Sequence, residues 1–369
     1  MQSKTSKQKN IVKELIDRAQ KCKCPANYTL KQCLADSLNN QGLDSDVESR
    51  ARGFIQDARN LAVFQKQGPT FFKSEQDGLR FLKRLMKAIS RKVPCRQQEI
   101  MDLVFYIYAK LTGSDVVKAP FLVGPPGTGK TYLVESLVEA MNICGISTGF
   151  YRAVCRHDVT GLHVTGLEGD LIGTECIYSN AQPGMIAKLL VSDGNDLAFI
   201  FIDELEKGIG TNIGLMLNLF DPSAPLKDHF LNGVFRTVPH DLRKRLLVVA
   251  GGNNHLMIEK ISELRDRLDL IPFTPYSVQE KIAVVTRIYK EKMSSVATNK
   301  IGEQRIKKRA ERILKTNEDM SIRHLLASIE KELLLGKLLN KNDYHLEQDP
   351  WQQLATKPTK RRVGFTAKH

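Results

Sequence analysis

The chain has 369 residues, of which 42% are hydrophobic, so it is long enough to bury a full core and to divide into two or three domains. Its formal net charge of +14 at pH 7 favours a polyanionic partner such as nucleic acid, or else a solvated surface rich in lysine and arginine. No apolar run reaches the roughly 20 residues that a membrane-spanning helix needs, and the N-terminus lacks the hydrophobic core of a signal peptide. These features exclude a lone binding module and a membrane protein, and they predict a soluble, cytoplasmic protein.

Seven cysteines are present, and their spacing lacks the pairs of a zinc module. An odd number of unpaired cysteines is typical of reduced thiols inside a cell. Cys22, Cys24 and Cys33 could form part of a metal site, but no fourth ligand stands nearby in the sequence.

The first 65 residues are polar, with apolar residues at helical spacing in segments such as 11–16 and 30–38. This region predicts either an ordinary packing domain or a helical surface that contacts a partner or DNA. A strongly basic helix is expected over residues 78–89, and a more apolar helix over residues 97–111.

The most specific motif follows a short apolar run at residues 121–123, which is typical of a buried strand. The next residues match the phosphate-binding pattern GxxxxGKT: Gly124, Pro125, Pro126, Gly127, Thr128, Gly129, Lys130 and Thr131, with Tyr132 following. Glycines let the backbone turn its amides toward phosphate oxygens, Lys130 reaches the β- and γ-phosphates, and the Thr131 hydroxyl binds Mg²⁺. A helix expected over residues 131–141 adds its N-terminal dipole. The motif predicts ATP and Mg²⁺ as cofactors.

Polar side chains follow two further apolar strands. The strand from residue 197 ends in Asp203, which would order Mg²⁺ and its waters, and Glu204, which would act as general base on the attacking water. The strand from residue 246 ends in amides, and Asn253 there would hold the attacking water or sense the γ-phosphate, or else be a plain turn residue. The chain is therefore expected to be an ATPase.

Strands and helices alternate up to about residue 275, which predicts a three-layer α/β fold with a parallel sheet. Three more helices are expected over residues 278–292, 304–314 and 321–339, enough for a small bundle. The expected division is a helical N-terminal region (1–94), a phosphate-loop ATPase domain (95–275), a helical lid (276–340) and a basic, flexible tail (341–369).

The order of these motifs resembles the AAA+ ATPases, and their detail resembles the ATPase module of the Lon proteases over roughly residues 95–340. Tyr178–Gly184 is similar to that family's YIGAMPG, Asp203–Lys207 to its DEIDK, and Leu219–Pro222 to its LDP. Asp228–Leu231 is similar to its DHYL, Leu264–Asp269 to its LLDRME, and Ser321–Glu330 to its sensor 2 helix. Lon proteases continue into a protease domain with a Ser-Lys dyad, whereas this chain ends soon after its lid. No peptidase activity is expected in it.

The resemblance implies roles for three further positions. Asn253 falls on sensor 1, Arg267 on the arginine finger and Arg323 on sensor 2. An arginine finger enters the site of a neighbouring subunit, so the resemblance implies a homo-oligomeric ring, with a hexamer as the expected form. Arg265 is the alternative finger, and either arginine could instead pair locally with Asp266 or Asp269.

Tyr178 matches the aromatic residue of the family's pore loop, which grips an extended polypeptide. The family has an aliphatic residue after this aromatic, whereas this chain has Ser179 there. Residues 161–176 also differ from the family's basic stretch. Tyr178 could also be a loop aromatic packed on the sheet.

The resemblance therefore implies a ring-shaped ATPase that remodels or unfolds a protein substrate. The alternative is a DNA-associated AAA+ ATPase, such as a replication or transposition accessory, which the excess of bases, the helix from Arg80 to Lys87 and the tail from Lys357 to Arg362 favour. A regulatory scaffold locked by ATP is a third interpretation, against which the intact pair of Asp203 and Glu204 argues.

Overall fold

The computed structural model describes residues 26–39, 42–64, 69–114, 116–155, 166–236, 238, 240–294 and 303–338. The N-terminal segment 11–16, Cys22, Cys24 and the basic tail lie outside the described residues. The chain forms two compact units, Met1–Tyr276 and Ser277–His369.

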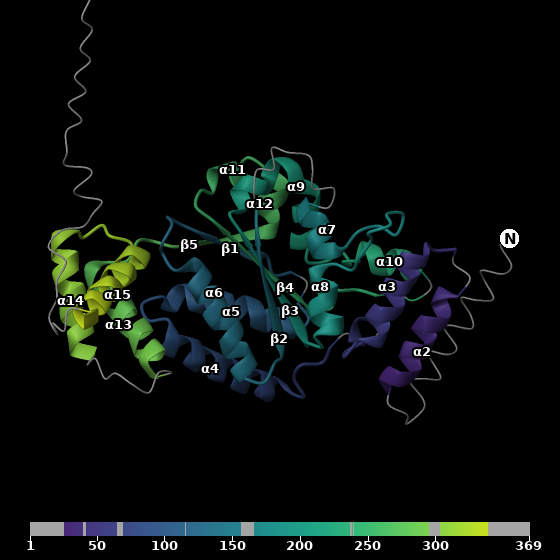
Figure 1. Cartoon of the computed structure of the whole chain (residues 1–369), viewed down its shortest axis with the longest axis horizontal. Coiled ribbons are helices and arrows are strands. Elements are labelled where there is room, and N and C mark those ends of the chain that lie inside the picture. The colour runs from purple at the N-terminus through teal and green to yellow at the C-terminus, as the bar shows by residue number, and fades with distance from the viewer. Residues whose placement is uncertain are drawn as a thin grey trace, which may run out of the picture. The chain divides into compact units, whose positions relative to one another are not determined.

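The first unit is built on a five-stranded parallel sheet (Figure 1). Its strands, in sheet order, are β2 (Thr148–Val154), β3 (Leu197–Asp203), β4 (Leu246–Gly252), β1 (Ala119–Val123) and β5 (Leu268–Pro272). Strands β1, β3 and β4 are buried along their whole length, as expected for continuous apolar runs covered on both faces. Because β1 lies between β4 and β5, the loop that follows it leaves from the interior of the sheet.

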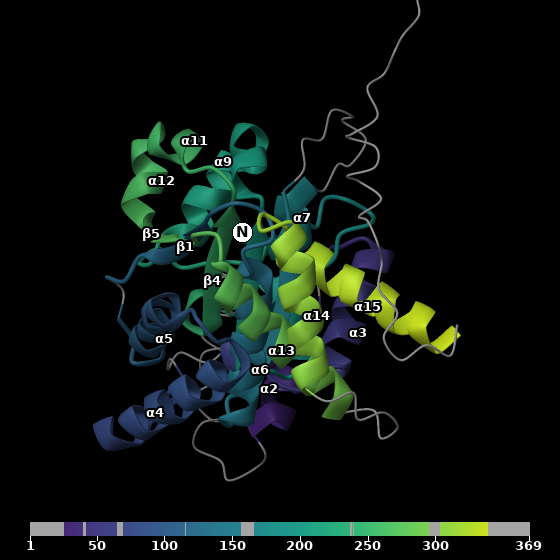
Figure 2. The ribbon, with the colours of Figure 1, turned by 90° about the vertical axis from the view of Figure 1, so that its left-hand side faces the viewer.

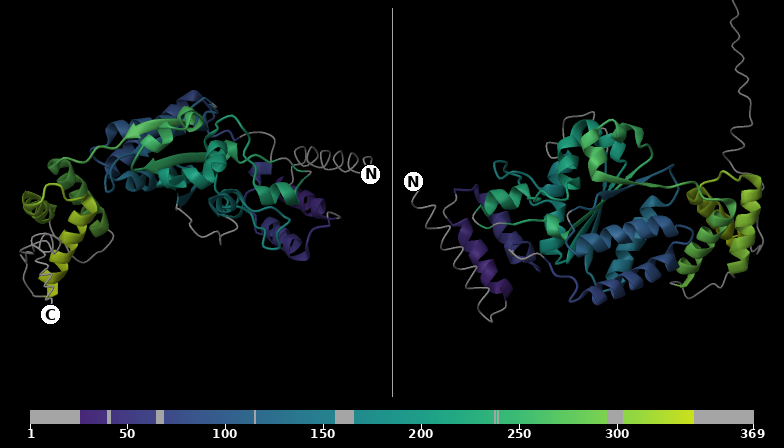
Figure 3. Two further views of the ribbon diagram at one scale, coloured as in Figure 1. Left: turned by 90° about the horizontal axis from the view of Figure 1, so that it is seen from above. Right: turned by 180° about the vertical axis from the view of Figure 1, so that it is seen from behind.

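Alternate side chains of each strand enter two different cores, because successive strand residues point to opposite faces. In β3, Phe199 and Phe201 enter one core, while Ile200 and Ile202 enter the other. Three helices line the first core: α4 (Glu75–Lys92), α5 (Gln97–Leu111) and α6 (Lys130–Ile143). Figures 2 and 3 show α4 on the outer side of this layer. The fold is a three-layer α/β fold.

Helix α4 precedes residue 94, where the N-terminal region was expected to end. Its apolar stripe of Phe81, Leu85 and Ile89 is nevertheless buried in the same core as α5 and α6. Three-and-four spacing predicts such a stripe but not which element covers it.

The second core is lined by the N-terminal helices and by the helices between the later strands. They are α2 (Ala26–Leu38), α3 (Ser45–Gln56), α7 (Gly166–Ile172), α8 (Met185–Ala187), α9 (Leu205–Phe220), α10 (His229–Val234), α11 (Leu256–Glu259) and α12 (Ser262–Arg267), with the 3₁₀ turns Ala62–Phe64 and Arg243–Arg245 and a π-helical turn at Lys188–Ser192. Helix α3 begins at the Asp44 cap, and its Val47, Ala51 and Phe54 are buried in this core. The N-terminal helices therefore pack on the same core as the sheet.

The second unit contains α13 (Val278–Ser294), α14 (Glu303–Thr316) and α15 (Ile322–Leu338), close to the three helices expected from sequence. Lys281 Nζ donates to Glu318 O at 2.5 Å, and Arg312 pairs with the buried Glu332 at 2.5 Å. Of the helices that the structure describes, none is long and apolar enough to cross a membrane.

Candidate functional site

The phosphate-binding pattern forms a tight loop between β1 and α6. A Cβ on Gly124 would lie 2.1 Å from Phe273 O, so this position accepts only glycine. Gly127 and Gly129 have φ of +81° and +90°, in the left-handed region. Such backbone lets successive amides face a common point, as an anion requires.

Lys130 is the first residue of α6 and is only 8% exposed. Its Nζ donates to Gly124 O at 2.5 Å and Pro125 O at 3.2 Å, and it lies 3.4 Å from Asn253 Oδ1. Burial lowers the pKa of Lys130, and the charges of Asp203 and Glu206 act in the opposite direction. Lys130, the Asn253 amide, Asp203 and Glu206 thus lie together.

The N-terminus of α6 is suited to an anion. Gly129 occupies the cap position and has no side chain to accept the first N–H groups of this 14-residue helix. Their partial positive charge favours phosphate at this end.

Asp203 ends β3 and is 9% exposed. Arg152 on β2 donates to its Oδ2 from Nη2 at 2.5 Å and from Nε at 3.1 Å. The other oxygen, Oδ1, accepts the Glu204 N–H at 3.0 Å. Sequence reasoning did not find Arg152, because the contact joins neighbouring strands and β2 was not among the expected strands.

Glu204 has φ of +57°, which is unusual for a residue other than glycine. It is the cap residue of α9, and its Oε2 accepts from Lys207 Nζ at 2.9 Å. Backbone strain of this kind is found where the surrounding structure holds a functional side chain in place.

Glu206 is a third acidic residue at the site, two positions after Glu204. Its Oε1 accepts the Asn253 N–H at 3.0 Å, and its Oε2 is buried with no hydrogen-bond partner. The acidic segment Asp203–Lys207 contained this residue, but sequence alone assigned it no role.

Arg96 connects the loop to the end of the first unit. It is 3% exposed, and its guanidinium carbon lies 3.9 Å from the Tyr276 ring centroid. It donates to Thr128 O at 3.3 Å and to Thr274 O at 2.6 Å. The loop is therefore held by an arginine that the motif does not include.

Thr131 and Asp203 are the two protein ligands that the sequence predicts for Mg²⁺. Among the described residues, no group of three histidine, cysteine or acidic side chains could hold a metal ion. A metal at this position would take most of its ligands from phosphate and water, as Mg²⁺ does with nucleotides. The Mg²⁺ role of Thr131 and Asp203 stays a prediction.

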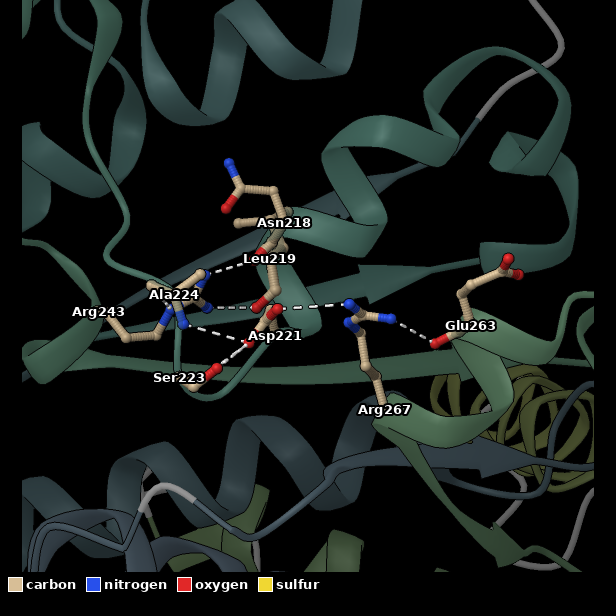
Figure 4. A network of polar contacts seen from close by, with 8 residues as sticks. All are labelled: Asn218, Leu219, Asp221, Ser223, Ala224, Arg243, Glu263 and Arg267. Atoms are coloured by element: carbon tan, nitrogen blue, oxygen red, sulfur yellow. Dashed lines mark hydrogen bonds and ion pairs between the residues drawn. The ribbon is translucent and has the colours of Figure 1, made fainter.

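Arg267 ends α12, and the alternative to a finger role was a local ion pair with Asp266 or Asp269. The structure instead pairs it with Asp221, at 3.4 Å, and its Nη1 donates to Glu263 O at 2.9 Å (Figure 4). Asp221 also accepts from the Ser223 N–H and hydroxyl and from the Ala224 N–H, and these bonds, together with Arg267, lower its pKa to about 2.

Arg243 also contacts the segment around Asp221 (Figure 4). It donates to the carbonyls of Asn218, Leu219 and Ala224, with the bond to Ala224 at 3.0 Å. The C-terminus of α9 is therefore fixed next to Arg267.

Tyr178 lies in a loop over residues 173–184. Its base is closed by Thr174 N–H to Gln182 O at 3.1 Å and Gln182 N–H to Thr174 Oγ1 at 2.9 Å. Ile177 is 78% exposed and Tyr178 is 46% exposed. Tyr178 is thus not buried against the sheet, and Ile177 places an aliphatic side chain before it, where the family pattern has one after it.

Asp228 holds the end of this loop. It is fully buried, caps α10 by accepting the Leu231 N–H at 2.9 Å, and accepts the Gly184 N–H at 2.8 Å. Burial raises its pKa to about 7.

The N-terminal helices also reach the loop. Arg50 on α3 donates to Asp46 O at 3.0 Å and to the carbonyl of Ser179, the residue after Tyr178. The backbone N–H groups of Arg59 and Asn60 donate to Val191 O in the π-helical turn that follows the loop, at 2.8 and 3.1 Å.

Arg323 lies in the first turn of α15 in the second unit and is exposed. Its sensor 2 role stays a prediction.

Residues 120–276 match the family model described as "ATPase family associated with various cellular activities (AAA)". This segment holds the loop, the acidic strand end, Asn253 and Arg267. The chain therefore contains an AAA domain.

Within that class, the chain is similar to Lon proteases over its ATPase region. It is 32% identical over 193 residues to the mitochondrial Lon protease homolog of Bos taurus, covering 50% of this chain and 18% of that protein. It is 27% identical over 289 residues to the Lon protease of Mycoplasma pneumoniae, covering 76% of this chain and 33% of that protein. The chain thus spans a third or less of these relatives' lengths.

Among solved structures, the closed state of Hsp104 with ATPγS and FITC casein has a TM-score of 0.56 at 17% identity. The match covers 80% of this chain and 56% of that chain. The likeness shows a shared fold.

Proposed function

We propose that this protein binds ATP with Mg²⁺, hydrolyses it, and uses the energy to remodel or unfold a polypeptide. The observation that carries the proposal is the exposed pair Ile177 and Tyr178 on a loop closed at its base, within the AAA domain that holds the ATP site. An aliphatic and an aromatic side chain offer apolar contact to an extended chain without reading its sequence.

The site residues have separable roles in this proposal. Loop amides and Lys130 bind the phosphates, and Thr131 with Asp203 would hold Mg²⁺, which neutralises charge on the phosphates. Glu204 accepts the proton of the attacking water, and Asn253, within reach of Lys130, orients that water or senses the γ-phosphate.

Two arginines have further roles in this proposal. Arg267 would act in the site of a neighbouring subunit of a homo-oligomeric ring, a hexamer in our proposal, and Arg323 would report the nucleotide state from the helical lid formed by the second unit. Arg267 is 30% exposed in its side chain, so its guanidinium remains accessible beside Asp221.

The test is steady-state ATPase activity with and without an unfolded polypeptide. Lys130→Ala should abolish nucleotide binding and turnover. Tyr178→Ala should keep basal turnover and lose most of the stimulation by polypeptide. Stimulation that survives Tyr178→Ala would contradict gripping by this loop, and tight ATP binding by Lys130→Ala would contradict the loop assignment.

The second candidate function is a DNA-associated AAA ATPase. The basic outer face of α4 favours it, and stimulation of turnover by DNA rather than by polypeptide would support it.

A further inference from the structure

The phosphate-binding loop packs against residues 273–276, which follow β5. A Cβ on Gly124, the first glycine of the loop, would lie 2.1 Å from Phe273 O, and a Cβ on Gly129, the last, would lie 2.9 Å from the Tyr276 hydroxyl oxygen. At both positions the space between the two segments is therefore too small for a side chain. The loop and residues 273–276 are thus in direct contact at the first and last glycines of the loop.

Arg96 joins the same two segments by hydrogen bonds. Its Nη2 donates to Thr128 O of the loop at 3.3 Å and to Thr274 O at 2.6 Å. Its guanidinium carbon lies 3.9 Å from the centroid of the Tyr276 ring and 5.0 Å from the centroid of the Phe273 ring. A planar guanidinium presents several donors in fixed directions, so one side chain can bond to two carbonyls while its face stacks on a ring.

Arg96 is costly to bury, which argues against a role in packing alone. It is 3% exposed, and it pairs with Glu99 at 2.8 Å. Its Nε is buried and, within the described part of the chain, has no hydrogen-bond partner. A buried charge with an unpaired donor lowers stability, and an apolar side chain would fill the same space without this cost. What the guanidinium adds is the pair of bonds to Thr128 and Thr274.

Residues 273–276 lead directly into the second unit. Tyr276 is 7% exposed and is the last residue of the first unit. The next residue, Ser277, donates from its N–H and its hydroxyl to Glu280 Oε2, both at 2.8 Å, and accepts the Glu280 N–H at 3.3 Å. This reciprocal pair caps the start of α13. The buried ring beside Arg96 is thus one peptide bond away from the cap of α13.

We propose that Arg96 is a positioning residue that makes the phosphate-binding loop and residues 273–276 respond together to a bound nucleotide. The inference rests on the proposed binding of ATP by the loop, and it does not depend on assembly into a ring. Phosphates that order the loop fix the Thr128 carbonyl, and Arg96 transmits this order to residues 273–276. Arg96 also holds the loop before the nucleotide arrives, so less conformational entropy is lost on binding.

Hydrogen–deuterium exchange with peptide resolution tests the proposal, with and without saturating ADP and Mg²⁺. In the wild type, ADP should slow amide exchange both in residues 124–131 and in residues 273–276. Arg96→Gln at saturating ADP should still protect residues 124–131 but should lose most of the protection of residues 273–276. Its affinity for a fluorescent ADP should fall about tenfold, because hydrogen bonds from a charged donor are lost.

The same variant separates binding from turnover. The KM for ATP should rise about tenfold, whereas turnover at saturating ATP should fall less than about threefold, because a bound nucleotide restores the order of the loop. A smaller fraction of folded protein would instead lower turnover and leave KM unchanged, and that result would contradict a positioning role.

The matched control is Arg245→Gln. Arg245 is another partly buried arginine that donates to a carbonyl, Asp196 O at 3.1 Å, and it lies before β4 at the edge of the sheet opposite the loop. The control should lower thermal stability while keeping the affinity for ADP and the protection of both segments. Equal losses of protection in the two variants would show general loosening and overturn the proposal, as would protection of residues 273–276 that survives Arg96→Gln.

The wild type tests the proposal even if Arg96→Gln fails to fold. ADP that protects residues 124–131 without protecting residues 273–276 would overturn the coupling and leave the ATP site standing. Absence of ADP binding, with exchange unchanged in both segments, would contradict the proposed function and the coupling together.

Discussion

At the scale of single residues, the site contains two glutamates, two positions apart, that have different hydrogen-bond partners. Glu204 pairs with Lys207 and has a left-handed backbone, whereas Glu206 accepts the Asn253 N–H. The two carboxylates are two residues apart in sequence, and the charge of Glu206 acts on Lys130, so the general base has to be identified by experiment rather than by proximity.

We expect Glu204→Gln to bind ATP normally and to hydrolyse it about 10²- to 10⁴-fold more slowly, because the amide cannot accept a proton from water. Glu206→Gln keeps an oxygen acceptor for the Asn253 N–H and should retain most of the turnover. The measurement is single-turnover hydrolysis beside nucleotide affinity. A larger loss from Glu206→Gln than from Glu204→Gln would exchange the two roles.

Asp221 makes stability depend on pH. Its folded-state pKa, about 2, lies below the ordinary value of 3.8, so its contribution is present above about pH 4 and is lost as pH falls toward 2. Asp221→Asn should lower the free energy of unfolding by about 1–2 kcal/mol at pH 7 and by much less near pH 2.

Urea unfolding at several pH values checks this prediction. The exposed Asp266, on α12, provides the control, since Asp266→Asn should have little effect at any pH. An Asp221→Asn loss that stays constant down to pH 2 would mean that packing rather than charge is affected.

At the scale of elements, α9 connects the proposed general base, Glu204, to the proposed arginine finger, Arg267. It starts after Glu204 and ends before Asp221, which holds Arg267. The helix is interrupted at Asn212, with φ of −122° and ψ of 21°. A change at Glu204 therefore has a physical route to the arginine, through a helix in two segments whose far end Arg243 fixes.

The N-terminal helix α3 supports the loop at Tyr178 through the Arg50 guanidinium. Arg50→Ala should loosen this loop, and the loss of about 1 kcal/mol for one hydrogen bond predicts about fivefold faster amide exchange in residues 175–182. Hydrogen–deuterium exchange with peptide resolution measures it. Arg52→Ala removes an arginine of the same helix that pairs with Glu48 instead, so equal exchange in the two variants would refute the support by Arg50.

Local patterns predicted the central elements well and long-range contacts poorly. The apolar runs of β1, β3 and β4 and the spacing of α5 are visible in sequence. Burial of a strand on both faces leaves a continuous apolar run, and burial of a helix on one face leaves a helical period. Strand β2, with Tyr151 and Arg152 only partly buried or exposed, and the short β5, which contains Pro272, leave a weaker signal.

In the candidate site, too, local motifs were predictable from sequence and long-range contacts were not. The loop from Gly124 to Thr131 and the acids after β3 are contiguous, so sequence places them together. Arg96 and Arg152 contact the site, and Asp221 contacts Arg267, across sequence separations of 32 to 178 residues. No local pattern carries such a contact, because it depends on the order of strands in the sheet and on helices packed across it.

At the scale of the whole molecule, the proposed ring requires each active site to be shared. A subunit would supply Glu204 to its own nucleotide and Arg267 to its neighbour's, which is a head-to-tail interface. Arg267→Ala and Glu204→Gln should each be nearly inactive alone while binding ATP.

Mixing the two variants in equal amounts should recover activity. A site is complete only where an Arg267→Ala subunit, with its intact Glu204, lies beside a Glu204→Gln subunit that offers its intact Arg267. If subunits mix at random and sites act independently, about a quarter of the sites are complete, so turnover should reach about a quarter of wild type. Light scattering and differently labelled subunits verify that the variants assemble together. Complete absence of recovery in verified mixed assemblies would mean that Arg267 acts within its own subunit, where its bond to Asp221 at the end of α9 would make it a structural residue.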